Sequence, residues 1–246
     1  MSRLDGAKVV IVGGAGGVGE GIVRVLLQRG ARVLVSSRSE EKLRELAAYC
    51  EDISGGELTT VVGDLSGEET ARVLQHQIFE RFRELDVAVA SLGGWVQGKP
   101  LTSVDMATWN QVLRDNLTSH FLAIKMLVPL LHPKTGSYIH VNGFSAEQPY
   151  AMAGPVAMAS AAQKSMALTL AEELKPTGIR VFELILGPVR TRARLRQGQV
   201  RSDWLTPEEI GDYVAGLITG QIGGRTDGKS EIVHRLMSKN DLLPVN

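Results

Sequence analysis

Residues 9–21 read VVIVGGAGGVGEG, and this stretch decides the fold of the chain. A short run of β-branched residues leads directly into a turn that is dense in glycine. Apolar residues then recur at helical spacing at Ile22, Val23, Leu26 and Leu27, so the pattern predicts a strand, a tight turn and a helix. Because glycine lacks a Cβ atom, a diphosphate can approach the backbone N–H groups where the helix begins. The stretch therefore predicts a nucleotide-binding turn; the alternative is a flexible surface loop.

The composition excludes several classes of protein. The 246 residues include 27 Lys and Arg and 27 Asp and Glu, so no net field attracts nucleic acid or an anionic membrane. The single cysteine, Cys50, rules out an intrachain disulfide and a cysteine-based metal site. The first residues lack the apolar core of a signal peptide, and no apolar run is long enough to span a membrane. We expect a soluble, cytoplasmic protein with no resident metal.

Strand and helix patterns alternate along the chain. The expected strands are short apolar or β-branched runs at 9–12, 32–36, 58–62, 85–90, 137–142, 179–186 and 230–236. Long helical patterns cover 109–131 and 156–174, and capping boxes at 66–69 (SGEE) and 206–209 (TPEE) predict two further helix starts. No linker rich in Pro, Ser or Gly interrupts the alternation. The pattern therefore indicates an α/β fold, a doubly wound parallel sheet with helices on both faces, in a single domain over 1–246.

The end of the second expected strand indicates which nucleotide binds. It reads Ser36-Ser37-Arg38 and follows the glycines by about twenty residues, where a dinucleotide fold faces the adenosine ribose. A site for NAD places a carboxylate here, whereas the fork of an arginine suits the 2′-phosphate of NADP. We therefore expect Ser37 and Arg38 to favour NADPH over NADH; the alternative is a solvated arginine. Asp64, which ends the third strand, either binds the adenine amino group or caps its own turn.

Several stretches together resemble the short-chain dehydrogenase/reductases. They are LDGAKVVIVGGAGGVG at 4–19, GDLS at 63–66, WNQVLRDNLTSHF at 109–121, LAEELKPTGIRV at 170–181 and GPVRT at 187–191. The resemblance keeps the family's order and spacing over about residues 4–220. It implies a Rossmann-like fold with a seven-stranded parallel sheet, a homodimer or homotetramer, and binding of NAD(H) or NADP(H).

The resemblance also assigns site residues. Gly13, Gly17 and Gly19 match the family's glycine motif at G-x-x-x-G-x-G spacing, with Val18 among the cofactor-binding residues. The remaining matches are Asp64 and Leu65 for the pair that contacts adenine, Gly93 for the glycine after the fourth strand, Thr191 for the residue near the nicotinamide carboxamide, and Asn116 for the structural Asn of the active site.

The resemblance ends at the residues that carry the chemistry. Family members have a Ser upstream of a Tyr-x-x-x-Lys: the Tyr exchanges the carbonyl proton, the Lys lowers the pKa of the Tyr and holds the ribose, and the Ser orients the substrate oxygen. The corresponding positions here are Gly143, Val156 and Ser160. Valine cannot transfer a proton at any pH, and serine does not replace the charge of the Lys. We therefore expect an NADP(H)-binding protein with weak or no ordinary carbonyl reductase activity.

Two alternatives stay open. An active NADP-dependent oxidoreductase would use a substituted site of Tyr150, Lys164 and Asn116, which requires the loop of Tyr150 to fold back over the cleft. A pseudoenzyme subunit, kept for assembly with an active relative, would need no nucleotide. His140, another titratable side chain nearby, lies in the middle of an expected strand and is expected to be packed.

The segment 190–205 is a possible lid. Its arginines precede the first acid, Asp203, and are Arg190, Arg192, Arg194, Arg196 and Arg201. In the family this region is the flexible substrate lid, and a basic lid predicts a small anionic ligand or contact with the phosphates of the nucleotide. The alternative is a solvated helical face. The sequence does not name the substrate.

Overall fold

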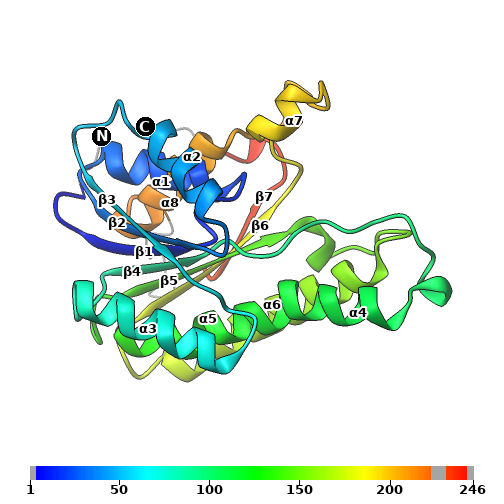
Figure 1. The fold of residues 1–246 in the computed structure, drawn as a ribbon, viewed down its shortest axis with the longest axis horizontal. Coiled ribbons are helices and arrows are strands. Elements are labelled where there is room, and N and C mark those ends of the chain that lie inside the picture. Colours follow the sequence, from blue (N-terminus) through cyan, green and yellow to red (C-terminus); the bar gives the residue numbers. More distant parts are fainter. Residues whose placement is uncertain (1–3, 223–230, 243–246) are drawn as a thin grey trace.

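Seven parallel strands form one sheet in the computed structural model, which describes residues 4–222 and 231–242 (Figure 1). In chain order they are β1 (Lys8–Val12), β2 (Arg32–Ser37), β3 (Glu57–Val62), β4 (Val87–Ala90), β5 (Ser137–Gly143), β6 (Arg180–Leu186) and β7 (Val233–Leu236). Their spatial order is β3-β2-β1-β4-β5-β6-β7, and every neighbouring pair is parallel. The order reverses between β1 and β4, as predicted for a doubly wound sheet, and ligands bind beyond the strand ends at such a point.

Helices cover both faces of this sheet (Figure 1). One face carries α1 (Gly19–Gln28), α2 (Glu40–Tyr49) and α8 (Pro207–Thr219); the other carries α3 (Glu68–Phe82), α4 (Met106–Leu113), α5 (Ser119–Leu127) and α6 (Gly154–Leu174). The short α7 (Arg192–Arg196) projects away from the sheet. In β1, Val9 and Ile11 belong to the core under α1 and α8, whereas Val10 and Val12 belong to the core on the opposite face. Burial on both faces explains why this strand is apolar without interruption.

The two predicted capping boxes have different outcomes. The one at 206–209 is confirmed, because the Glu209 N–H donates to Thr206 Oγ1 at 3.1 Å and the Thr206 N–H donates to Glu209 Oε2 at 2.8 Å. The one at 66–69 is wrong: Gly67 is the N-cap of α3, with no side-chain cap. The backbone N–H and the hydroxyl of Ser66 both donate to Asp64 instead. A carboxylate two residues away is the stronger acceptor, so it captures the serine that the pattern assigns to the helix.

The expected helical region at 109–131 is confirmed, but its hydrogen-bonding pattern changes along its length. It consists of α4, a π-helical turn at Arg114–Thr118 and then α5. The side chain of Asn116 stabilises the turn, since its Nδ2 donates to the Val112 carbonyl at 3.2 Å and its Oδ1 accepts from the Gly94 N–H at 2.9 Å. π-helical turns occur often at functional sites. The last expected strand, 230–236, is observed at Val233–Leu236, and Ser230 lies outside the described residues.

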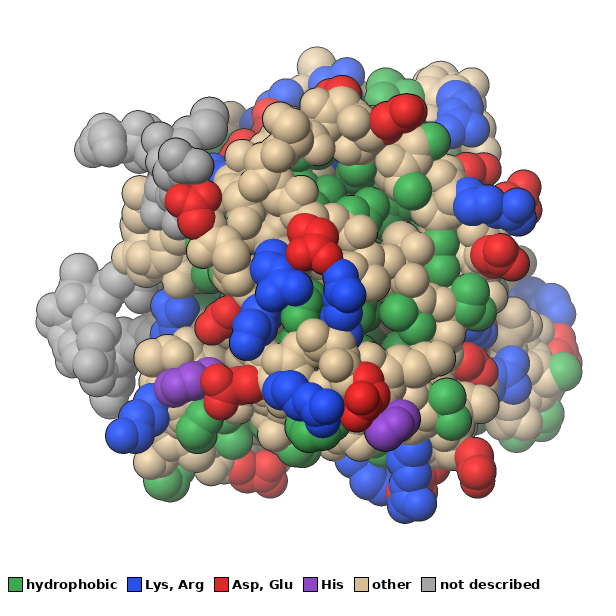
Figure 2. All heavy atoms as spheres, turned by 60° about the vertical axis from the view of Figure 1, so that its left-hand side comes forward, with side chains coloured by type: hydrophobic (Ala, Val, Ile, Leu, Met, Phe, Trp, Pro, Cys, Tyr) green, Lys and Arg blue, Asp and Glu red, His purple; other side chains and the backbone are tan. Residues whose placement is uncertain are grey.

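Charges of both signs are mixed on the surface. On the face shown in Figure 2, Lys and Arg side chains lie among Asp and Glu side chains rather than in a patch of one sign. Many pair directly, as Arg29 does with Asp212 at 2.6 Å and Arg32 with Glu57 at 2.9 Å. This face therefore lacks the basic footprint of a nucleic-acid-binding surface. Within the part of the chain that is described, no helix combines the length and apolarity needed to cross a bilayer.

Candidate functional site

Two adjoining cavities lie at the carboxyl ends of the strands. The β2 cavity, of about 250 Å³, is lined by residues that follow β2 and β3. The β5 cavity, of about 430 Å³, is lined by residues at the ends of β5 and β6. Gly16, Ser91, Leu92 and Gly93 line both of them. The two cavities therefore form one continuous cleft at the reversal point of the sheet.

The glycine turn lies between the two cavities and depends on close backbone approach. Gly13 has a φ of +78°, and a Cβ atom there would lie 2.2 Å from the carbonyl oxygen of Ser91. A Cβ atom at Gly17 would lie 2.8 Å from Thr191 Cγ2, and one at Gly19 would lie 2.6 Å from the carbonyl oxygen of Gly13. Each position therefore excludes any larger residue without a shift of its surroundings. Gly17 lines the β5 cavity, whereas Gly19 lines neither cavity and allows the turn to close on α1.

The start of α1 offers unused hydrogen-bond donors. Within the described residues, no hydrogen bond is formed by the N–H groups of Gly17, Val18 and Gly19. Such groups at a helix start bind anions, and phosphates in particular. Glu20, in the first turn, would oppose an anion, but Arg192 binds its carboxylate with Nε at 2.9 Å from Oε1. The ion pair leaves the helix start free of net negative charge.

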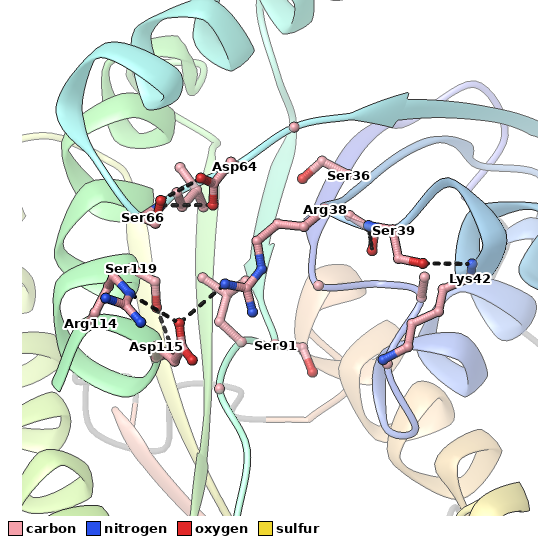
Figure 3. Close-up of a pocket in the computed structure, with 18 residues that line it drawn as sticks. Ser36, Arg38, Ser39, Lys42, Asp64, Ser66, Ser91, Arg114, Asp115 and Ser119 are labelled. Carbon is pink, nitrogen blue, oxygen red and sulfur yellow. Dashed lines mark hydrogen bonds and ion pairs between the residues drawn. The ribbon is translucent and has the colours of Figure 1, made fainter. Parts of the chain in front are cut away.

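The β2 cavity contains the residues expected to read the nucleotide (Figure 3). Ser37 and Arg38 line one wall, as predicted, together with Lys42 from the first turn of α2. Arg38 reaches across the cavity, and its Nη1 lies 3.2 Å from Oδ1 of Asp115 in the π-helical turn. The sequence interpretation missed Lys42, although its place in the helix that begins just after Arg38 could have indicated it. It also missed Asp115, because only the fold brings residues 77 positions apart together.

Asp64 and Leu65 also line the β2 cavity. Leu65 is buried and contributes an apolar wall. Both carboxylate oxygens of Asp64 accept hydrogen bonds from Ser66, one of them from the backbone N–H at 3.0 Å. Of the two roles expected for Asp64, the structure therefore shows the capping of its own turn.

The β5 cavity contains the three positions at which the resemblance led us to expect the family's Ser, Tyr and Lys. Gly143, Val156 and Ser160 all line it, together with Gly93 and Thr191. The hydroxyl of Ser145 donates to Ser160 Oγ at 3.1 Å, so two neutral hydroxyl groups are paired here. The lining among the described residues contains no Asp, Glu, His, Tyr, Cys or Lys, and its one ionisable side chain is Arg194.

A model of the family described as short chain dehydrogenase matches residues 7–201. The chain belongs to this family. Among curated relatives, a 3-oxoacyl-[acyl-carrier-protein] reductase of rhamnolipid biosynthesis from Pseudomonas aeruginosa is 32% identical over 207 residues, which cover 78% of this chain and 75% of that protein. An uncharacterized oxidoreductase from Staphylococcus saprophyticus is 26% identical over 192 residues, which cover 78% of this chain and 82% of that protein.

Solved structures share the fold. A metagenomic short-chain oxidoreductase in complex with NADP has a TM-score of 0.76 and 25% identity, and the match covers 94% of this chain and 98% of that one. A short-chain type dehydrogenase/reductase from Mycobacterium ulcerans has a TM-score of 0.82 and 19% identity, covering 96% and 88%. The Rossmann-like seven-stranded sheet of this chain is therefore the family fold.

The cleft fits the dinucleotide that the family binds. The open N–H groups at the start of α1 suit a diphosphate, and the glycines keep side chains out of its path. Arg38 and Lys42 would meet the adenosine end, in a cavity that opens directly into the β5 cavity. Thr191, which lines the β5 cavity beside Gly17, would face the nicotinamide end.

The side chain of Asn116 binds backbone groups of the protein. The side-chain amide of Asn116 is hydrogen-bonded to the backbone of Gly94 and Val112. The backbone carbonyl oxygen of Asn116 accepts a hydrogen bond from Gln163 Nε2. Asn116 lines the β5 cavity but is buried, so the retained family residue holds the π-helical turn in place. Gln163 lies on α6 next to the cavity, and no motif in the sequence pointed to it.

A buried polar layer lies beneath the β5 cavity. His140 Nε2 lies 3.1 Å from Gln163 Oε1, and its ring stacks on His120 with the centroids 4.3 Å apart. Burial lowers the pKa of His140 to about 4, so it is neutral near pH 7 and packed, as the sequence predicts. Glu183 is fully buried on β6, and burial raises its pKa to about 8. An acid inside the apolar run RVFELIL was the signal for it in the sequence.

The structure does not bring Tyr150 and Lys164 together. Lys164 Nζ lies 2.6 Å from Glu147 Oε1, and Arg235 binds the same carboxylate at 2.6 Å, so that the two cations lower the pKa of Glu147 to about 2. The ring of Tyr150 packs instead against Trp95, with centroids 5.0 Å apart. Each member of the substituted site is thus held by other partners.

Several arginines of segment 190–205 contact other groups of the protein, which neither the basic lid nor the solvated helical face had predicted. Arg192 pairs with Glu20, and its guanidinium lies 4.1 Å from the ring centroid of Tyr49. Arg194 Nη1 donates to the carbonyl oxygen of Val189 at 3.0 Å. Arg201 pairs with Asp203 at 3.1 Å. Arg192 and Arg194 are therefore held by the protein, whereas Arg201 forms an ion pair on the surface with its side chain 71% exposed.

Proposed function

We propose that this chain binds NADP(H) in preference to NAD(H) and has weak or no ordinary carbonyl reductase activity. Two cations on one wall of the β2 cavity, Arg38 and Lys42, support the preference, as does the lack of a carboxylate at the end of β2. A phosphate dianion meets charge-assisted donors there, whereas a ribose hydroxyl meets no carboxylate at that strand end. The solved metagenomic relative, which is 25% identical and holds NADP, agrees with the proposal.

One observation carries the catalytic part of the proposal: the described lining of the β5 cavity has no side chain that exchanges a proton near pH 7. Arginine stays protonated in proteins, so Arg194 cannot serve as an acid. The nicotinamide, when bound, supplies the hydride. Among the residues of this chain, the hydroxyl groups of Ser145 and Ser160 can orient a substrate oxygen, whereas the side-chain N–H groups of Asn142 already donate to Ser160 and Glu183. Hydride transfer itself requires only that the nicotinamide and the acceptor lie close together, so a low residual activity is compatible with the proposal.

The proposal extends to assembly and location. We propose a homodimer or homotetramer, because α5 and α6 expose apolar side chains, among them Phe121 and Met158. Segment 190–205 is proposed as a lid, with α7 at its centre. The mixed surface charge and the single buried cysteine are compatible with the cytoplasm.

The nucleotide preference is tested by titration. Fluorescence titrations of the wild-type protein with NADPH and NADH should show NADPH binding about ten- to a hundred-fold tighter, the value of one charge-assisted contact. Arg38→Asp should reverse the preference. Arg44→Asp is the matched control, because Arg44 is an exposed residue of α2, the helix that follows Arg38, and does not line the β2 cavity. Equal wild-type affinities would contradict the preference, and no binding of either nucleotide would support the pseudoenzyme subunit.

A further inference from the structure

The ion pair between Arg38 and Asp115 spans the β2 cavity (Figure 3). Arg38 comes from the loop after β2, and Asp115 comes from the π-helical turn on the opposite wall. Arg114 approaches the same carboxylate oxygen, with Nε 3.8 Å from Oδ1 of Asp115. The arginine expected to read the nucleotide is therefore already bound to a carboxylate of the protein.

Asp115 is the fixed member of this pair. Its carbonyl oxygen accepts the hydroxyl of Ser119 at 2.8 Å, and the next residue, Asn116, is tied to Gly94. The side chain of Asp115 is only 22% exposed, whereas that of Arg38 is 62% exposed. A ligand that takes Arg38 therefore draws the guanidinium away and leaves the carboxylate where it is.

One carboxylate of the β2 cavity opposes the transfer of Arg38 from Asp115 to a phosphate. Its lining carries the cations Arg38, Lys42 and Arg114 and the acids Asp64 and Asp115. Asp64 is occupied by Ser66, so Asp115 is the acid that competes for Arg38. A phosphate monoester carries nearly two negative charges at pH 7 and repels a nearby carboxylate. The neutral 2′-hydroxyl of NADH needs no such exchange.

We propose that Asp115 is a specificity-determining residue that competes with the 2′-phosphate of NADPH for Arg38. It thereby holds the preference for NADPH over NADH below the value that Arg38 and Lys42 alone would produce. This inference rests on the proposed binding of NADP(H) in the cleft. It concerns the ratio of the two affinities rather than the existence of binding.

The test is Asp115→Asn, which keeps the size of the side chain and removes its charge. We expect NADPH to bind about fivefold tighter and NADH to change by less than about twofold, in line with the loss of one partly exposed ion pair. Glu172→Gln is the charge-matched control, because Glu172 pairs with Lys175 on the surface at the end of α6. Retained NADH binding shows that the Asp115→Asn variant is folded.

The same substitution in an Arg38→Ala variant separates competition for Arg38 from direct repulsion between Asp115 and the phosphate. In Arg38→Ala, adding Asp115→Asn should change NADPH affinity by less than about twofold, because no arginine remains to be released. Unchanged or weaker NADPH binding by Asp115→Asn alone would overturn the inference, and so would a gain that persists in full without Arg38. Wild-type protein that binds neither nucleotide would overturn the proposed function, and the inference with it.

Discussion

Glu183→Gln should change how the stability of this protein depends on pH. Glu183 is fully buried in the middle of β6, where Asn142 Nδ2 donates to its Oε1 at 2.8 Å and its Oε2 has no partner among the described residues. Burial raises the pKa of this carboxyl from its ordinary 4.5 to about 8. In the folded protein Glu183 is therefore mostly protonated at pH 7, whereas in the unfolded chain it is ionised.

The sign and size of the effect follow from proton linkage. Between pH 4.5 and 8 the folded state holds a proton that the unfolded chain has lost, so the free energy of unfolding falls as pH rises, by at most about 1.4 kcal/mol per pH unit. His140 acts in the opposite direction, since its pKa is lowered to about 4 and its contribution rises with pH up to 6.5. The buried His120 shifts in the same direction as His140. His234 also has a lowered pKa, through burial, and all three histidines remain in Glu183→Gln. The difference between the wild-type protein and this variant in the window from pH 6.5 to 8 therefore isolates Glu183.

The measurement is urea unfolding followed by circular dichroism at several pH values in that window. Between pH 6.5 and 8 the wild-type protein should lose up to about 2 kcal/mol more unfolding free energy than Glu183→Gln does. Glu147→Gln is the control, because paired cations lower the pKa of Glu147 to about 2 and it does not titrate there. Equal slopes for the wild type and Glu183→Gln would refute the reasoning.

Three further predictions concern the cofactor, the lid and the assembly. Gly17→Ala should weaken NADPH binding at least about fivefold, because the new Cβ atom must displace Thr191. Gly67→Ala is the control and should leave the affinity unchanged, because the nearest heavy atom to its Cβ would be 3.9 Å away. Equal NADPH affinities of the two variants would contradict the close fit at Gly17. Hydrogen exchange over 190–205 should slow when NADP(H) binds, and unchanged exchange with cofactor bound would count against a lid. Light scattering at micromolar concentration should give the mass of a dimer or tetramer; a monomer mass would contradict the proposed association of α5 and α6.

Local pattern was enough to predict the frame of the site. The apolar run of β1, the glycines after it and the end of β2 at Ser37 follow from rules that act within a few residues. Strand alternation then places all strand ends along one edge, which is why Arg38 was predicted to lie in the cleft. Thr191 was assigned there by the resemblance to the short-chain dehydrogenase/reductases.

The missed features depend on contacts between distant segments. Asp115 meets Arg38 across the cavity, and Gln163 on α6 reaches the carbonyl oxygen of Asn116, so no local spacing reveals either contact. The capping box at 66–69 failed for a local reason, since Ser66 donates to Asp64, an acceptor two residues away that the pattern did not consider. The sequence predicted side chains that line the cleft, but it did not predict which of them form hydrogen bonds or ion pairs with other residues of the protein.

The central claim is tested most directly by the rate of NADPH oxidation with a panel of aldehydes and ketones, at protein and NADPH concentrations at which binding is saturated. The account predicts little or no turnover by the wild type. It also predicts a gain towards the 10²–10⁴-fold typical of proton transfer when Gly143→Ser, Val156→Tyr and Ser160→Lys are combined. A Cβ atom at Gly143 has its nearest neighbour 3.9 Å away, so the serine has room. Robust wild-type turnover that Tyr150→Phe abolishes would contradict the account, because it would show a relocated catalytic site.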